Sequence, residues 1–116
     1  MAAIAIAKMS EYNAGIAVVA TALAAADAHT LDVTDVSSDK FQILIENTST
    51  NPGTVTFTDG AVYSEGSQGD LEVAILASAD KVICLESARF KNSSGLIAMG
   101  VAGSGFTGQA FASELP

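Results

Sequence analysis

The side chains in this sequence that could carry out chemistry are few and lie far apart. There is one histidine, His29, and one cysteine, Cys84. A cysteine nucleophile needs a neighbouring base, and no pattern in the sequence brings His29 near Cys84. Because Cys84 lies in the apolar run at residues 82–85, we interpret it as a small buried hydrophobic side chain. The sequence therefore predicts no cysteine-based active site.

Three carboxylates, Asp32, Asp35 and Asp39, lie close together in a polar stretch. Hard cations such as Ca²⁺ bind several oxygen ligands, so the cluster raises the question of a calcium site. The spacing lacks the alternating acidic positions, the central glycine and the closing glutamate of an EF-hand loop. A solvated acidic loop is the better interpretation, and we expect no metal and no other cofactor.

Glycines near the C-terminus mimic part of a nucleotide-binding motif. Gly100, Gly103 and Gly105 match a fragment of the dinucleotide fingerprint, which requires a helix directly after it to bind the pyrophosphate. No helix is predicted there, so these glycines indicate a turn. Ser104 has glycines on both sides but not the spacing of a nucleophile elbow. The sequence predicts no catalytic residues, and hence a protein that is not an enzyme.

The composition and charge of the chain restrict the classes of molecule that it could bind. The 116 residues are typical of one domain, and the formal net charge is −8. Binding to phosphate backbones needs clustered cations, whereas the five lysines and arginines here are scattered. We therefore expect no nucleic acid and no membrane as partner. Charged residues make up 16%, below the usual ~25%, which indicates that another protein or another copy covers part of the surface.

The most informative stretch spans residues 40–58. If residues 41–46 form a strand, Phe41, Ile43 and Ile45 share one face and Gln42, Leu44 and Glu46 share the other. Val55 and Phe57 alternate with threonines over residues 54–58 in the same manner, which is the period of a half-buried strand. Asn51, Pro52 and Gly53 lie between them and favour a turn. The pattern predicts a strand, a loop and a strand, most simply a hairpin.

Similar patterns recur along the chain. The run at residues 81–85 is almost wholly apolar, as in a strand covered on both sides. We predict an all-β, single-domain β-sandwich or small barrel of about seven to nine short, mainly antiparallel strands. Its parts would be an N-terminal arm or edge strand (1–13), the sandwich (14–102) and a Gly-rich C-terminal tail (103–116). Further strands are predicted over residues 2–7, 15–23, 70–76 and 96–102, and residues 29–39 are predicted to form a short strand followed by a loop.

The order of these pieces resembles a known group of proteins. KFQILIEN, TVTFTDG, DLEVAI and KVICLESARFKNSSGLIAMGVA follow one another with polar loops between them. Over about half of the chain this order resembles small all-β structural proteins of tailed bacteriophages, and the last piece looks like their closing hairpin. The resemblance implies an auxiliary head or decoration protein or another virion component.

These observations lead to one main hypothesis. We expect a non-enzymatic structural subunit of a phage virion, assembled in the cytoplasm of the host bacterium. It would be a head-decoration protein that packs on the major capsid protein and/or on copies of itself. The alternatives are a tail or neck subunit and a sugar- or receptor-binding module, which the 6% aromatic content and the absence of tryptophan disfavour. Candidate contact residues, for which ordinary core packing is an equal alternative, are Ile4, Ile6, Tyr12, Phe106 and Phe111.

Overall fold

Alternation of apolar and polar residues builds the strands of this protein. Every second side chain is buried along β5 (Phe41–Asn47) and along β6 (Gly53–Phe57). Because successive side chains of a strand point to opposite faces, each of these strands has one core face and one outer face. Burial of the core faces holds the two sheets of the fold together.

The computed structural model describes residues 2–9, 17–36, 40–60 and 69–115. These residues form ten strands and one helix of four residues. Besides β5 and β6, the elements are β1 (Ala2–Ala3), β2 (Ile6–Lys8), β3 (Thr21–Ala24), β4 (Ala28–Asp32), β7 (Leu71–Ile75), β8 (Asp80–Leu85), α1 (Ser87–Phe90), β9 (Leu96–Ala102) and β10 (Thr107–Glu114).

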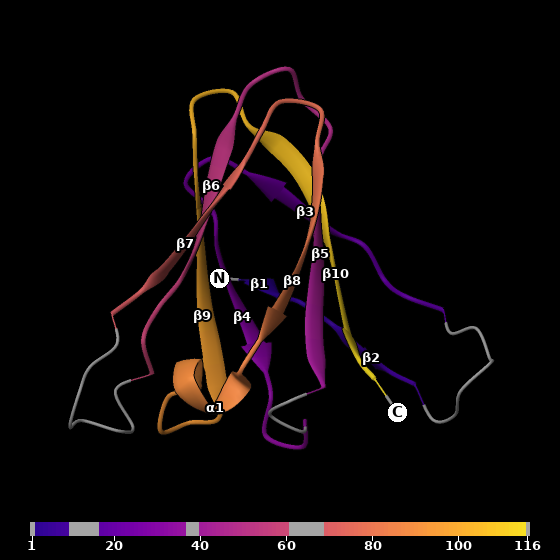
Figure 1. The fold of residues 1–116 in the computed structure, drawn as a ribbon, viewed down its shortest axis with the longest axis vertical. Coiled ribbons are helices and arrows are strands. Elements are labelled where there is room, and N and C mark those ends of the chain that lie inside the picture. Colours follow the sequence, from indigo (N-terminus) through magenta and orange to yellow (C-terminus); the bar gives the residue numbers. More distant parts are fainter. Residues whose placement is uncertain (1, 10–16, 37–39, 61–68, 116) are drawn as a thin grey trace.

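The strands form two sheets that pack face to face. Sheet A has the order β1-β4-β9-β6-β7, and sheet B has the order β2-β10-β5-β8, with β3 also paired to β10. Figure 1 views the sheets from the side, with β6, β7 and β9 of sheet A on the left and β5 and β10 of sheet B on the right. The predicted all-β sandwich is confirmed, and the sheets do not close into a barrel.

The strands from β3 to β10 pair like one long hairpin that has been rolled up. β6 pairs with β7, β5 with β8, β4 with β9 and β3 with β10, all antiparallel. Rolling adds two more antiparallel pairs, β6 with β9 and β5 with β10. This pairing scheme is that of a jelly roll, a double-sheet fold of eight strands.

The hairpin predicted over residues 40–58 is wrong. β5 lies in sheet B and β6 in sheet A, so the loop between them crosses from one sheet to the other. Buried Asn47 fixes this crossing: its amide nitrogen donates to the carbonyl oxygens of Asn51 (2.8 Å) and Leu76 (3.0 Å). Its side-chain oxygen accepts from the backbone nitrogen of Ser49 (2.9 Å). Alternation in each strand shows which side faces the core, but not which strand is the neighbour.

The closing hairpin suggested by the resemblance is also absent. β8 belongs to sheet B and β9 to sheet A, and α1 lies between them in the chain. Within α1, Phe90 is buried and its ring lies 6.4 Å from that of Phe57, centroid to centroid. The short helix therefore covers one end of the core, at the point where the chain passes from sheet B to sheet A.

Both termini belong to the sandwich. β1 pairs in parallel with β4 in sheet A, and β2 pairs in parallel with β10 in sheet B, so residues 2–8 add edge strands to the chain's own sheets. The predicted Gly-rich tail is wrong, because β10 is the longest strand and lies inside sheet B. Gly108 is required there, since a Cβ would collide with the backbone of Glu46.

The strand predicted over residues 15–23 is shorter than expected. β3 begins only at Thr21, and residues 17–20 before it are exposed and form no strand. Residues 15 and 16 lie outside the described part of the chain. The N-terminal segment contributes two short strands instead of one, which brings the number of strands in the described residues to ten.

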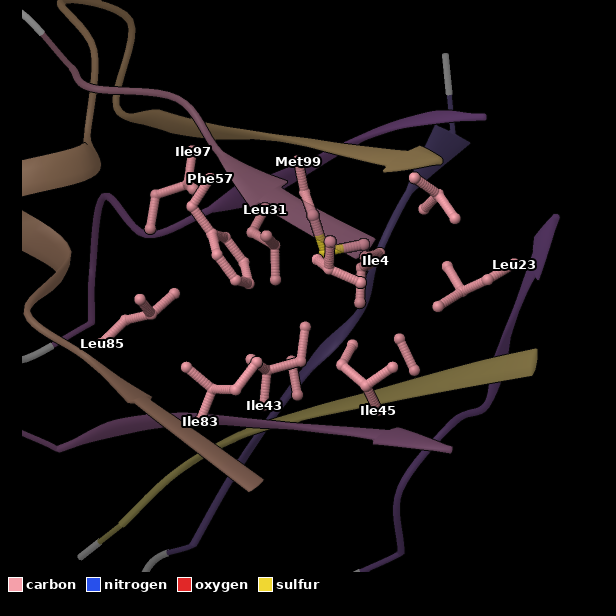
Figure 2. Packing of buried hydrophobic residues seen from close by; sticks show 14 of the residues in the cluster. Ile4, Leu23, Leu31, Ile43, Ile45, Phe57, Ile83, Leu85, Ile97 and Met99 are labelled. Atoms are coloured by element: carbon pink, nitrogen blue, oxygen red, sulfur yellow. The ribbon is translucent and has the colours of Figure 1, made fainter. Parts of the chain in front are cut away.

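The core lies between the two sheets. Figure 2 shows Leu31, Phe57 and Met99 of sheet A facing Ile43 and Ile45 of sheet B. All five are at most 1% exposed. Burial of a large apolar side chain contributes roughly 1.5–3 kcal/mol, so these inner faces supply most of the driving force for folding.

Candidate functional site

The outer face of sheet B carries a row of apolar side chains. Phe111 on β10 pairs with Leu44 on β5, and Leu44 pairs with Val82 on β8. Residues directly opposite each other in antiparallel strands project to the same side of the sheet. Because these three alternate with buried residues, they point away from the core. We call Phe111, Leu44 and Val82 the apolar row.

The apolar row is accessible in the isolated chain. Phe111 and Leu44 are half-buried, and Val82 is 59% exposed. Val18, which precedes β3, borders the same hollow on this face and is 43% exposed. The hollow has a volume of about 370 Å³. Its lining residues are Val18, Gln42, Leu44, Glu46, Val82, Phe111 and Ser113.

Polar side chains, together with the exposed thiol of Cys84, border the apolar row on both sides. On one side the paired positions are Ser113, Gln42 and Cys84, and the Gln42 amide donates to the Ser113 hydroxyl at 3.1 Å. On the other side Glu46 pairs with Asp80, which makes that border acidic. An apolar centre with a polar rim is the usual anatomy of a protein–protein interface. This arrangement suits the binding of another protein surface.

Cys84 is exposed rather than buried, which corrects the prediction from sequence. The reason is the position of its strand, because β8 is an edge strand of sheet B and has a core side and an outer side. Ile83 and Leu85 are buried, whereas Val82 and Cys84 project outward. The expectation that residues 81–85 are covered on both sides is therefore wrong for the isolated chain.

The five predicted contact residues fall in different places. Ile4 and Phe106 are 3% and 1% exposed and pack in the chain's own core, which was the alternative interpretation. Ile6 is half-buried on β2, and Tyr12 lies outside the described residues. Only Phe111 belongs to the apolar row. Leu44 and Val82 were missed, although each interrupts the strict alternation of its strand, a signal that a strand has two apolar faces.

The single histidine is buried and lies beside one carboxylate. His29 is 3% exposed, and its Nε2 lies 3.7 Å from Oδ2 of Asp27, beyond hydrogen-bond distance. Neither ring nitrogen has a hydrogen-bond partner among the residues that the structure describes. Cys84 is on the outer face of the other sheet, so the structure does not bring the histidine and the cysteine together.

The acidic stretch begins at the end of β4 with a hydrogen-bonded turn. Oδ1 of Asp32 accepts hydrogen bonds from the hydroxyl of Thr34 (2.7 Å) and from its backbone nitrogen (3.1 Å). These two bonds lower the pKa of Asp32. Asp39 lies outside the described residues. Within the described ranges, no three His, Cys, Asp or Glu side chains gather where they could hold a metal ion.

Comparisons with known protein families, with curated proteins and with solved structures find no match to this chain. In the part of the chain that the structure describes, no helix is both long and apolar enough to cross a membrane.

Proposed function

We propose that this chain is a non-enzymatic structural subunit of a phage virion, a head-decoration protein that packs on the major capsid protein. The sequence resemblance to virion proteins supports this function. The jelly-roll order of the strands also supports it, because viral capsid domains often have this fold. Because unrelated proteins share this fold, the fold alone does not determine the function. The proposal therefore depends on the surface of the molecule.

The observation that carries the proposal is the apolar row on the outer face of sheet B. Phe111, Leu44 and Val82 form a continuous apolar strip that the core does not use. Covering a large apolar side chain contributes roughly 1.5–3 kcal/mol, and less where it is already half-buried. One such contact is weak, but many copies on a repeating lattice bind firmly through multivalency.

Charge indicates what the opposing surface looks like. The rim at Glu46 and Asp80 is acidic, and the whole chain carries a formal net charge of −8. Complementary potentials steer association and fix the register of an interface. The partner surface should therefore have an apolar centre with Lys or Arg on the side that meets Glu46 and Asp80.

Capsid co-sedimentation tests the proposal. Shells assembled from the major capsid protein of the same phage genome are incubated with the purified chain and pelleted. We expect binding by the wild type and at least a tenfold loss, about 1.4 kcal/mol, for Leu44→Asp. The matched control is Thr56→Asp, a half-buried outer position on sheet A, which should bind like the wild type.

Two outcomes would contradict the proposal. The first is a folded wild-type chain that does not pellet with the shells, and the second is undiminished binding by Leu44→Asp. Binding of the isolated chain to a glycan array, in place of shells, would favour the sugar-binding alternative.

A further inference from the structure

At the β8 edge of sheet B, some backbone groups have no partner among the described residues. The backbone nitrogen of Asn47 donates to the carbonyl oxygen of Ala79 at 2.9 Å. Hydrogen bonding alternates along an antiparallel ladder, so the odd-numbered residues of β8 face β5. Asp80, Val82 and Cys84 therefore direct their N–H and C=O groups away from β5. No strand among the described residues pairs with β8 on that side.

The neighbouring edge at β7 differs because a side chain covers part of it. β7 is the edge strand of sheet A at the same side of the sandwich. The Nζ of Lys81 donates to the carbonyl oxygen of Ala74 on β7 at 2.9 Å. The ammonium group therefore occupies one backbone acceptor of the β7 edge, and covering an edge is a common means of preventing strand addition. Among the described residues, nothing covers the outward backbone groups of Asp80, Val82 and Cys84 on β8 in this way.

We propose that β8 pairs antiparallel with β8 of a second copy, about a two-fold axis at Val82. Val82 would then lie opposite the partner's Val82, and Asp80 opposite the partner's Cys84. The backbone groups of Asp80, Val82 and Cys84 would all find partners. Both copies would contribute equally, as a two-fold interface requires.

The side chains select this register over its neighbours. Only registers that pair even-numbered residues with even-numbered ones satisfy the free backbone groups. A shift of two residues in one direction places Asp80 opposite the partner's Glu86, and like charges directly opposite each other are unfavourable. A shift of two residues in the other direction places Val82 opposite the partner's Asp80, so that an apolar side chain lies opposite a charged one.

The register centred on Val82 also extends the apolar row. In each copy the row runs from Phe111 through Leu44 to Val82 at the edge. Pairing at Val82 joins the two rows into one apolar belt across a continuous sheet. The inference goes beyond the proposed function, because the pairing does not depend on what covers the belt.

Disulfide trapping tests the register directly. In the variant Val82→Cys with Cys84→Ser, the two new thiols would lie in a hydrogen-bonded pair with Cα atoms about 5.5 Å apart, within reach of a disulfide. We expect a covalent dimer on mild oxidation. The wild type is the matched control, because the two copies of Cys84 would lie about 14 Å apart along the strands and should not cross-link.

Failure of the variant to cross-link, or equal cross-linking of the wild type through Cys84, would overturn the proposal.

Light scattering gives a second, independent test with the full chain. The wild type should have twice the mass of the 11.7 kDa chain, and Val82→Lys should be a monomer with unchanged circular dichroism. Val19→Lys alters another valine of similar exposure, 64% against 59%, and should remain a dimer. A monomeric wild type, or a dimeric Val82→Lys, would also overturn the proposal.

Discussion

The outer faces of the two sheets differ although their inner faces are alike. At the middle of sheet A, the paired positions are Glu72, Thr56 and Gly100, all small or polar. At the middle of sheet B they are the apolar row. A jelly roll needs only its inner faces to be apolar, so sheet A shows what folding alone requires. The apolar row exceeds that requirement, which is why we propose that it binds a partner.

The inner faces should respond to substitution in the same way in both sheets. Phe57→Ala in sheet A should lower the free energy of unfolding by about 3–5 kcal/mol, and Ile43→Ala in sheet B by about 2–5 kcal/mol. Both side chains are fully buried, so each truncation leaves a cavity. Urea unfolding measures the change. A loss below about 1 kcal/mol for either variant would mean that the two sheets do not share this core.

The crossing between the sheets should depend on Asn47. Asn47→Ala removes the donor to the carbonyl oxygens of Asn51 and Leu76 and the acceptor for Ser49. We expect a loss of about 1–3 kcal/mol, because buried polar groups lose their partners. Thermal unfolding is the measurement. Asn51→Ala, which removes one exposed 3.3 Å side-chain bond, is the control, and equal losses would contradict the role of Asn47.

The outer face of sheet A should accept a larger residue. Gly100 has an ordinary φ, and a Cβ built there meets no atom within 4 Å. Gly100→Ala should therefore raise stability by about 0.4–1 kcal/mol, since it restricts the unfolded chain. Gly108→Ala should instead destabilise the protein, because its Cβ would meet the backbone of Glu46. Denaturant midpoints compare the stability of the two variants with that of the wild type. Stability changes of the same sign in both variants would refute this contrast.

Of the substitutions considered, Thr34→Ala in the turn after β4 should change stability least. The hydrogen bonds from Thr34 lower the pKa of Asp32, so the carboxylate stabilises the folded state above its ordinary pKa. This contribution is lost as the pH falls through the lowered value. Thr34→Ala should move the pKa of Asp32 back towards normal, as an NMR titration would show. An unchanged titration would mean that the Thr34 hydroxyl is not the cause.

Strand positions could be predicted from the sequence, but strand partners could not. Alternation located β5, β6 and β7, and an apolar run located β9, because the apolar side chains of each strand gather on the face that turns towards the core. It did not reveal that β5 and β6 lie in different sheets, since both arrangements place the same residues in the core. β10 was missed because its buried residues are Gly108, Ala110 and Ala112, which are too small to give an apolar signal.

The candidate site was predicted only in part for the same reason. Phe111 stood out as a large apolar residue in a stretch that otherwise looked flexible. Leu44 was expected on the face opposite the core beside Gln42 and Glu46, and Val82 in a run expected to be covered on both sides. Neither pattern reveals whether the outer face of a strand is covered. That depends on pairings between segments far apart in the chain, which place β8 at an edge of sheet B.

Site-specific thiol labelling tests most directly whether the apolar row is the binding surface. Single cysteines are introduced by Leu44→Cys on sheet B and by Thr56→Cys on sheet A, each in a Cys84→Ser background, and maleimide labelling rates are measured with and without capsid shells. We predict that shells slow labelling at position 44 at least about tenfold, roughly 1.4 kcal/mol of protection, and leave position 56 unchanged. Protection of position 56 with free labelling at position 44 would contradict the assignment.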